Sequence, residues 1–287
     1  NDGGRQTVYD RGTATNSTIN DGGGQIVESG GTASNTTINK DGLQLVNDGG
    51  KASNTTINDG GVQDVYGTAD NTTINKDGRQ TVNDGGKASN TTIEMGGKLD
   101  VRTGGNATGV NQESGAALIA TTGNNTVVKG NNSLGEFSIE NGQAENVLLE
   151  NGGQLTVAGG TSASNTTINK DGRQTVNAGG TADNTTINKD GRQTVNAGGT
   201  ADNTTINKDG WQTVNGGGTA SNTTINNGGV QDVYGTADNT TINNGGWQTV
   251  NAGGTASNTT INNGGVQDVY GTADNTTINN GGWQTVN

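Results

Sequence analysis

One segment of this sequence recurs almost unchanged along the chain. The segment that begins at Asn165 reads Asn-Thr-Thr-Ile-Asn-Lys-Asp-Gly-Arg-Gln-Thr-Val-Asn-Ala-Gly-Gly, and it returns at Asn184 and Asn203. Degenerate copies fill nearly all of the 287 residues. A repeat of about 19 residues has the length of one coil of a solenoid, in which neighbouring repeats share a thin continuous core. The repeat therefore predicts a solenoid and not a single compact core.

Composition alone would favour a disordered chain, because hydrophobic residues make up only 26% of the sequence and glycine accounts for 53 residues. The formal net charge is -12, from 15 Lys and Arg against 27 Asp and Glu, and this repels nucleic acid. Nucleic acid is therefore not an expected partner. Cys and His are absent, which excludes a disulfide, a thiolate nucleophile, an imidazole base and a Cys/His zinc site.

Aligned on the isoleucine of Asn-Thr-Thr-Ile, the sequence divides into about 15 coils, most of them 19 residues long and a few 17. Each coil holds three short extended pieces, and Gly, Asn and Asp stand at the corners between them. This layout predicts an all-β fold, a parallel β-helix of triangular section, as a single repeat domain over residues 1–287 with degenerate coils at 104–160. The aligned column is Ile19, Ile38, Ile57, Ile74, Ile93, Val110, Val128, Leu149, Ile168, Ile187, Ile206, Ile225, Ile242, Ile261 and Ile278.

The degenerate coils indicate which side chains point inward. Regular coils carry Gln80 and Val82 two residues apart, on one face of a strand. Degenerate coils carry apolar pairs at these positions: Leu99 with Val101, Phe137 with Ile139, and Leu155 with Val157. The glutamine column is therefore predicted to be inside, where stacked amides can hydrogen-bond along the axis. A solvated glutamine is the alternative. The same comparison places Thr36 inside and Thr37 outside.

Outward hydroxyl groups are the densest surface feature that the alignment predicts. They have three competing uses: a residue type that simply favours strands, an array of O-glycosylation acceptors, or a flat ice-binding ladder. One column contains Thr37, Thr56, Thr73, Thr92, Thr167, Thr186, Thr205, Thr224, Thr241, Thr260 and Thr277. A second contains Thr81, Thr175, Thr194, Thr213, Thr249 and Thr285.

Aromatic residues are few and gather near the end of the sequence. Trp211, Trp247 and Trp283 share one outward position in alternate coils, and Tyr234 and Tyr270 end the strands between them. An exposed aromatic stripe is a candidate contact surface for a sugar or a protein. The alternative is that each tryptophan only covers a corner.

Catalytic and metal sites are not expected. Carboxylates such as Asp64 and Asp100 could in principle pair as acid and base across neighbouring coils. Most carboxylates, however, recur with the repeat, as in the Lys-Asp-Gly corners, and a recurring Asp at a corner is interpreted as a turn residue. The Gly-Gly-x-Gly-x-Asp pattern of calcium-binding repeats is missing. No cofactor, metal or enzymatic activity is therefore predicted.

The repeat Thr-Ala-(Ser/Asp)-Asn-Thr-Thr-Ile-Asn-x-x-Gly-x-Gln-x-Val-Asn-x-Gly-Gly resembles the 19-residue repeat of passenger domains from AIDA-type self-associating autotransporter adhesins. The likeness extends over essentially the whole chain and is loose at 104–160. It implies a right-handed β-helix at the outer surface of a Gram-negative bacterium, adhesion to a host-cell surface protein or glycan, and autoaggregation and biofilm formation through contact with other copies. Because the sequence starts and ends inside a repeat, we expect it to be a fragment of a longer passenger.

The same resemblance implies that a cytoplasmic heptosyltransferase modifies repeat Ser and Thr hydroxyls before export. The candidate acceptors are the outward threonines and the serines of Ala-Ser-Asn: Ser34, Ser53, Ser89, Ser164, Ser221 and Ser257. Many coils have Asp at the serine position, so that column cannot be modified throughout. Two other functions remain open: a polysaccharide-active β-helix enzyme, which needs a cleft with clustered non-periodic carboxylates, and an ice-binding rod.

Overall fold

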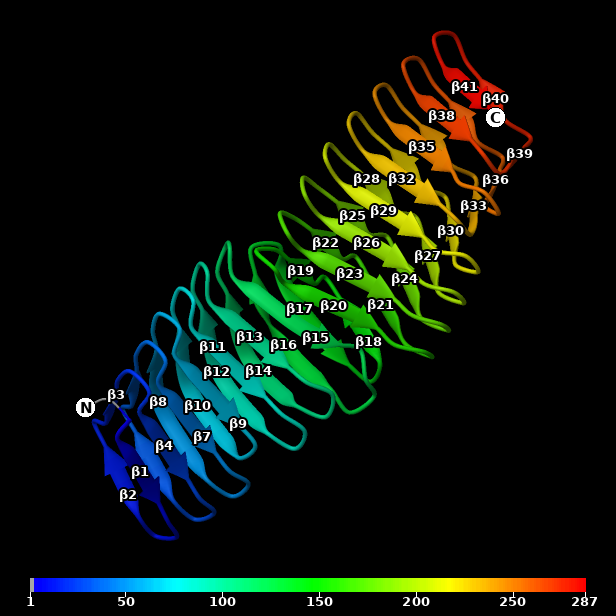
Figure 1. The fold of residues 1–287 in the computed structure, drawn as a ribbon. Coiled ribbons are helices and arrows are strands. Elements are labelled where there is room, and N and C mark those ends of the chain that lie inside the picture. The colour runs from blue at the N-terminus through cyan, green and yellow to red at the C-terminus, as the bar shows by residue number, and fades with distance from the viewer. Residues whose placement is uncertain (1–2) are drawn as a thin grey trace. The chain divides into compact units, whose positions relative to one another are not determined.

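Every regular element of the protein is a β-strand over residues 3–287, the part that the computed structural model describes (Figure 1). The chain divides into two compact units, Asn1–Asn141 and Gly142–Asn287. Within each unit, strands of successive repeats pair in parallel, so that each repeat forms one coil of a β-solenoid. The predicted fold class is therefore confirmed. That residues 1–287 form a single domain stays a prediction.

In unit 1, the first face of the coils is formed by β1 (Arg5–Val8), β4 (Gly24–Val27), β7 (Leu43–Val46), β9 (Val62–Val65), β11 (Arg79–Val82), β13 (Lys98–Val101) and β15 (Ala117–Thr121). The rest of each coil is formed by β2 (Thr13–Thr15), β3 (Thr18–Ile19), β5 (Thr32–Ser34), β6 (Thr37–Ile38) and the longer strands β8 (Lys51–Ile57), β10 (Thr68–Ile74), β12 (Lys87–Ile93) and β14 (Asn106–Gln112).

In unit 2, each coil contributes one strand to each of three faces. The first face contains β20 (Gln154–Val157), β23 (Arg173–Val176), β26 (Arg192–Val195), β29 (Trp211–Val214), β32 (Val230–Val233), β35 (Trp247–Val250), β38 (Val266–Val269) and β41 (Trp283–Val286). The second contains β18 (Gln143–Glu145), β21 (Ser162–Ser164), β24 (Thr181–Asp183), β27 (Thr200–Asp202), β30 (Thr219–Ser221), β33 (Thr236–Asp238), β36 (Thr255–Ser257) and β39 (Thr272–Asp274). The third contains β19 (Leu148–Leu149), β22 (Thr167–Ile168), β25 (Thr186–Ile187), β28 (Thr205–Ile206), β31 (Thr224–Ile225), β34 (Thr241–Ile242), β37 (Thr260–Ile261) and β40 (Thr277–Ile278).

The corners between strands are formed by residues that adopt a left-handed backbone conformation. Asn184, the first residue of an Asn-Thr-Thr triplet, has φ 53°, and Asp190 of a Lys-Asp-Gly corner has φ 59°. Asn, Asp and Gly adopt this conformation at the lowest cost. In the coil that carries Asn-Gly-Gly at this corner, Gly228 takes the place of the aspartate with φ 73°. The recurring aspartates are therefore turn residues, as predicted.

The short coils lose their two residues at a corner. The amides of Tyr234 and Gly235 both donate to the carbonyl of Val214, at 2.8 and 3.0 Å, which pulls the chain directly across the corner. A Cβ atom on Gly235 would overlap the carbonyl oxygens of Asn215 and Gly218. The strands on either side keep their register, since Gln212 pairs with Gln231 and Gln231 with Gln248.

The interior combines apolar columns with a ladder of glutamines. Ile187, Val195 and Ala201 are fully buried, and so are the corresponding residues of neighbouring coils. Gln193 donates from Nε2 to Oε1 of Gln174 at 2.7 Å and to Oγ1 of Thr185 at 3.2 Å. The glutamines are 0–1% exposed from Gln174 to Gln267, so the prediction of an inward amide ladder is confirmed. Thr36 is buried and Thr37 half-buried, as the degenerate coils indicate.

The alignment is wrong in part of the degenerate segment. Ile93 pairs with Gln112, so Val110 does not continue the isoleucine column, and Val128 pairs with Ala107. Strand β16 (Val127–Asn132) is then followed by β17 (Gly135–Glu140), and the two run antiparallel, so they form a hairpin in place of a coil. Gly135, with φ 119°, lies where the chain reverses. Phe137 and Ile139 of the hairpin are buried, but they pair with Gly130 and Val128, so their assignment to the glutamine and valine columns is wrong.

The rest of the degenerate segment follows the prediction. Leu99 pairs with Gln80, Leu149 with Ile168, and Leu155 with Gln174. Each apolar residue thus occupies the column assigned to it from the sequence.

Candidate functional site

The predicted threonine acceptors form a column on the outside of the coils. Thr37 pairs with Thr56 in unit 1, and Thr167, Thr186 and Thr205 pair in succession in unit 2. All five are half-buried, between a buried threonine and a buried isoleucine. Neighbouring hydroxyls are therefore one coil apart, about 4.8 Å along the strand-pairing direction. Their modification stays a prediction.

The predicted serine acceptors fall into three environments. Ser89, Ser221 and Ser257 donate their hydroxyls to carboxylates one coil earlier, those of Asp70, Asp202 and Asp238, at 2.6, 2.7 and 2.8 Å. Ser34 pairs with Thr15 of the preceding coil, and Ser53 pairs with Ser34, so neither faces an aspartate there. Within residues 3–287, their hydroxyls make no bond to a carboxylate. Ser164 lies near the carbonyl of Ala144, at 3.5 Å. All six serines are half-buried.

These bonds hold two of the aspartates in their ionised form. Hydrogen bonds from Ser221, and then from Asn222 and the backbone of Asn203, lower the pKa of Asp202 against a smaller effect of burial. Asn258 and Ser257 lower the pKa of Asp238 in the same way. A hydroxyl that donates to a carboxylate makes a stronger hydrogen bond than one that donates to another hydroxyl.

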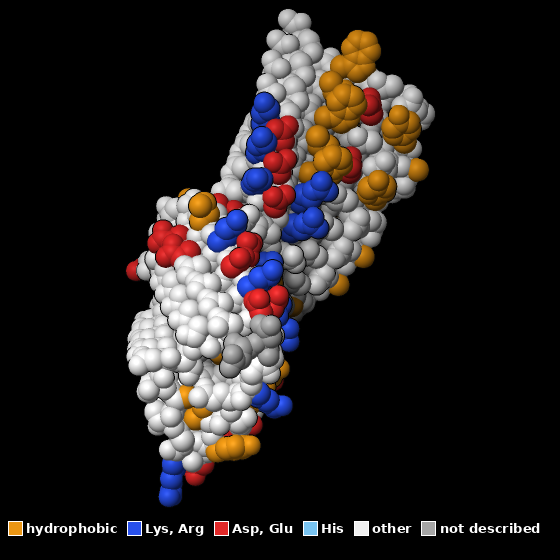
Figure 2. Space-filling model, turned by 60° about the vertical axis from the view of Figure 1, so that its left-hand side comes forward, with side chains coloured by type: hydrophobic (Ala, Val, Ile, Leu, Met, Phe, Trp, Pro, Cys, Tyr) orange, Lys and Arg blue, Asp and Glu red, His pale blue; other side chains and the backbone are white. Residues whose placement is uncertain are grey.

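The predicted aromatic stripe lies on the first face of unit 2. Trp211, Val230, Trp247, Val266 and Trp283 pair in succession, so the three tryptophans are two coils apart, about 10 Å. The tryptophan side chains are 39%, 43% and 67% exposed in chain order. Tyr234 and Tyr270 are also exposed. Figure 2 shows a group of hydrophobic side chains close together on the surface.

Trp211 differs from the other two tryptophans because charged neighbours fix its ring. The guanidinium carbon of Arg192, one coil earlier, lies 5.8 Å from the ring centroid, within cation–π distance. On the other side, Trp211 hydrogen-bonds to the carboxylate of Asp232. Burial raises the pKa of Asp232, and the bonds from Trp211 and Thr249 oppose that rise. Trp283, in comparison, donates to Thr285 of its own strand at 3.0 Å.

A groove of about 370 Å³ runs beside Trp211, and the sequence did not single it out. One wall is the column of corner aspartates and the other is a column of arginines that ends at Trp211. We call it the unit 2 groove; it is lined by Asp171, Arg173, Asp190, Arg192, Asp209, Gly210, Trp211, Gly228 and Val230. Figure 2 shows neighbouring acidic and basic columns next to the hydrophobic side chains. The aspartates that the sequence analysis interprets only as turn residues therefore also line this groove.

The carboxylate pair considered as acid and base lies on the first face of unit 1. Asp64 and Asp100 pair with Thr81 from opposite sides, so they are two coils apart. Burial raises the pKa of Asp100, while Arg102, Arg79 and Lys98 lower it. Thr81 was predicted to be outward and exposed; it is fully buried instead, because it lies within this cluster of longer charged side chains.

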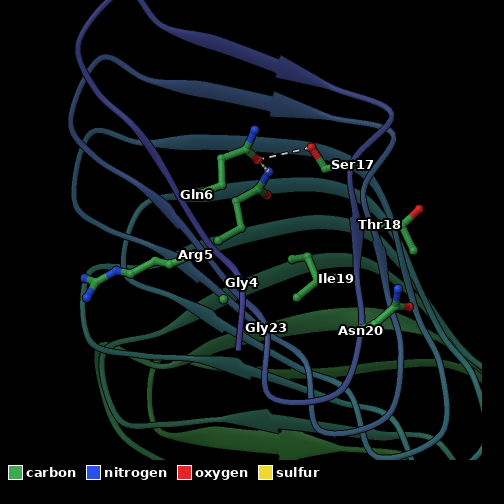
Figure 3. Close-up of a pocket in the computed structure, with 10 residues that line it drawn as sticks. Gly4, Arg5, Gln6, Ser17, Thr18, Ile19, Asn20 and Gly23 are labelled. Atoms are coloured by element: carbon green, nitrogen blue, oxygen red, sulfur yellow. Dashed lines mark hydrogen bonds between the residues drawn. The ribbon is translucent and has the colours of Figure 1, made fainter. Parts of the chain in front are cut away.

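A second cavity, of about 340 Å³, lies at the first coil, and its lining includes Gln6, Ile19 and Gln25 of the interior columns. Figure 3 shows Gln6 and Ile19 pointing inward, with Ser17 donating to Oε1 of Gln6 at 3.2 Å. The cavity continues the glutamine column, because Gln25 donates to the same oxygen.

Residues 3–287 also lack two further classes of feature. In that range there is no group of three His, Cys, Asp or Glu side chains arranged to hold a metal ion. It also contains no helix of the length and apolarity needed to cross a bilayer.

Comparison with known proteins places the sequence among adhesins. The sequence model of the family described as "Adhesin of bacterial autotransporter system, probable stalk" matches residues 1–42, 66–116, 129–191, 178–229 and 230–282. A stretch of 48 residues is 52% identical to the "Probable autotransporter YpjA" of Escherichia coli strain K12, covering 16% of this chain and 3% of that protein. The chain thus spans only a small part of that curated relative.

The fold is also similar to a solved structure. The crystal structure of a TibC-catalysed hyper-glycosylated fragment, TibA55-350, matches 99% of this chain and 91% of that chain. The two sequences are 38% identical and the TM-score is 0.51.

Proposed function

The chain belongs to the family of bacterial autotransporter adhesins, whose passengers are exported through the outer membrane to the cell surface, and on that premise we propose that it mediates autoaggregation and biofilm formation as well as adhesion. The observation that carries the proposal is the repetition of outward threonines, one per coil and in register. Many weak contacts of one kind, held on one scaffold, add up to strong attachment without any single tight site.

The experiment displays the chain on bacteria that do not otherwise aggregate. Cells that display it should clump and settle faster than cells with the same display carrier alone, and should leave more material on an abiotic surface. A mixed culture tests whether copies contact each other: labelled displaying cells should enter clumps of unlabelled displaying cells, and carrier-only cells should stay outside. Equal settling of the two strains would rule out the aggregative role.

We also propose that outward Ser and Thr hydroxyls are O-glycosylated, with a heptosyltransferase as the partner before export. The support is the similarity to the TibA fragment, which is described as hyper-glycosylated by TibC, together with the periodic half-buried hydroxyls of this chain. Intact mass of the protein produced with and without a heptosyltransferase tests this. Increments of one heptose are expected with the enzyme, and an unchanged mass would remove this part of the proposal.

The serine environments predict an order of modification. Transfer of a sugar to Ser89, Ser221 or Ser257 must break a bond to a carboxylate, whereas Ser34 and Ser53 carry no such bond. When the folded, unmodified chain is incubated with the enzyme, we expect Ser34 and Ser53 to reach higher occupancy, measured by peptide mapping. Substitution Asp70→Ala should raise the occupancy of Ser89 and leave that of Ser221 unchanged.

We propose a non-enzymatic role for the chain. The support is the placement of its carboxylates: Asp171, Asp190 and Asp209 have φ values of 60, 59 and 58° and serve the corners of successive coils. The non-periodic pair Asp64 and Asp100 is separated by a whole intervening coil. Incubation with bacterial and host polysaccharides should release no new reducing ends.

A further inference from the structure

We propose that the unit 2 groove binds a neutral glycan made of pyranose sugars and carried on a foreign surface. The inference rests on the proposed adhesive function and names the chemical class of its partner. The groove is a concave site with charged groups on two walls and an aromatic ring at one end. Ligand sites of this kind combine an apolar surface with a few polar groups that fix orientation.

The two walls have complementary hydrogen-bonding properties. The corner aspartates, all exposed, present acceptors at intervals of one coil. The facing column presents the guanidinium donors of Arg173 and Arg192, which pair in register. Neither arginine forms an ion pair with an aspartate of the groove in the part of the chain that the structure describes. A sugar hydroxyl can donate to a carboxylate and accept from a guanidinium, so a ligand rich in hydroxyls can satisfy both walls.

Trp211 supplies the apolar surface that a pyranose ring needs. Sugar rings have a face of C–H groups that packs on an aromatic ring. Of the three tryptophans, Trp211 is the one that lines the groove, and Arg192 and Asp232 hold it from opposite sides. A ring fixed in this way loses little conformational entropy when a ligand binds.

The charge of the groove argues for a neutral ligand. Three carboxylates and two guanidinium groups line it, and the chain as a whole carries -12. The exposed Lys170, Lys189 and Lys208 precede the three aspartates in their corners, so the groove itself has no excess of negative charge, and a polyanion would meet repulsion from the rest of the molecule. Beyond the groove the column continues through Val230 to Trp247, two coils or about 10 Å from Trp211. An extended glycan could therefore reach a second aromatic ring.

The test uses the purified, unmodified chain, so that no sugar attached to the protein itself can occupy the groove. Linear hexasaccharides of β-1,4-linked glucose, β-1,4-linked N-acetylglucosamine and α-1,4-linked glucose are titrated, with heparin as the polyanion. Heat of binding and tryptophan fluorescence are measured. At least one neutral hexasaccharide should bind, and Trp211→Ala and Arg192→Gln should each weaken its binding about tenfold or more.

Matched variants separate the groove from the rest of the surface. Trp283→Ala removes a more exposed tryptophan of the same column, and Arg79→Gln removes an arginine at the equivalent repeat position in unit 1; both should change binding less than about twofold. Urea unfolding must show that all four variants fold. Binding of none of the neutral sugars, binding of heparin alone, or equal losses in groove and control variants would overturn the inference.

The outcome is separable from that of the proposed function. If displaying cells aggregate while the purified chain binds no neutral sugar, only the glycan site is wrong. If Trp211→Ala reduces self-association in sedimentation experiments and wild-type protein binds no sugar, the groove serves a second copy of the chain and the inference fails.

Discussion

At the scale of single residues, the buried glutamines are the feature on which the interior depends. From Gln193 to Gln267, each Nε2 donates to the glutamine of the preceding coil and each Oε1 accepts from the following one, as in the bonds of Gln212 to Gln193 and of Gln231 to Gln212 at 2.6 Å. At the start of the unit 2 ladder, where Leu155 replaces a glutamine, Nε2 of Gln174 donates to Thr166 at 3.0 Å. A buried amide that loses its partner costs more than the bond itself contributes, so continuity of the ladder matters.

Replacing one ladder residue tests this continuity. We expect Gln212→Leu to lower the free energy of unfolding by about 1–2 kcal/mol, because the loss of hydrogen bonds at two neighbouring amides exceeds the gain from a larger apolar side chain. Urea denaturation followed by circular dichroism measures it. The control is Gln154→Leu, the same change at an exposed position, which should stay within about 0.5 kcal/mol. A more stable Gln212→Leu protein would contradict the argument.

Two aspartates should respond to pH in opposite directions. Burial raises the pKa of Asp100 in the folded state, so its ionised form opposes folding, and that opposition disappears as the pH falls through the folded pKa. We expect Asp100→Asn to raise the urea midpoint at pH 7 and to lose this advantage below about pH 4.

Asp202 provides the contrast, because hydrogen bonds from Ser221 and Asn222 lower its pKa. Its contribution to stability is present above the unfolded pKa and is lost as the pH falls through the folded one. Asp202→Asn should therefore lower the urea midpoint at pH 7, and the difference from wild type should shrink in acid. Two variants that shift the midpoint in the same direction at pH 7 would be inconsistent with these assignments.

The sequence predicts residue orientation well because substitutions occur within the repeat. Leu99 and Leu155 reveal the inward glutamine column, and Val147 reveals the inward threonine. The unit 2 groove could not be predicted in this way. Arg173, Arg192 and Trp211 are successive residues of one outward column, which the alignment does reveal. The distance between that column and the corner aspartates depends on the backbone angle at each corner, which the alignment does not give.

At the scale of elements, the corners set the length of each coil. The short corner at Gly235 brings the backbone against the carbonyls of Asn215 and Gly218, where no side chain fits. We expect Gly235→Ala to destabilise unit 2 by about 1–3 kcal/mol, because the corner must widen. Gly216→Ala is the control: its Cβ would meet Tyr234 O at 3.8 Å, and equivalent corners carry Ala178 and Ala197. Chemical denaturation compares the two, and equal effects would refute the explanation.

The hairpin β16–β17 is the element that the repeat could not reveal. Alignment to a period assumes that every segment is a coil, and the burial of Phe137 and Ile139 satisfies a coil and a hairpin equally well. The direction of β17 depends on the turn at Gly135 and on contacts such as Lys129 with Glu140, at 2.8 Å. A Cβ on Gly130 would overlap the carbonyl of Val110, which fits a glycine at this irregular pairing.

At the scale of the whole molecule, charge should control association. Copies that each carry a formal charge of -12 repel at low ionic strength, and salt screens that repulsion over about 10 Å at 0.1 M. Aggregation of displaying cells should therefore strengthen as ionic strength rises from a few millimolar, as followed by settling in buffers of one pH. A steep weakening with salt would show that ion pairs between copies hold the clumps together.

The interior amides from Gln193 to Gln284 all donate to the preceding coil, and this common direction allows the chain to change its length by whole coils. Any whole coil inserted between two others receives a free acceptor from the coil before it and offers one to the coil after it, with every outward column carried on unbroken. Gain or loss of complete repeats by unequal recombination can thus lengthen or shorten the protein while every buried glutamine keeps its hydrogen-bond partners. Gain or loss of part of a repeat would leave a buried amide without a partner at the altered position.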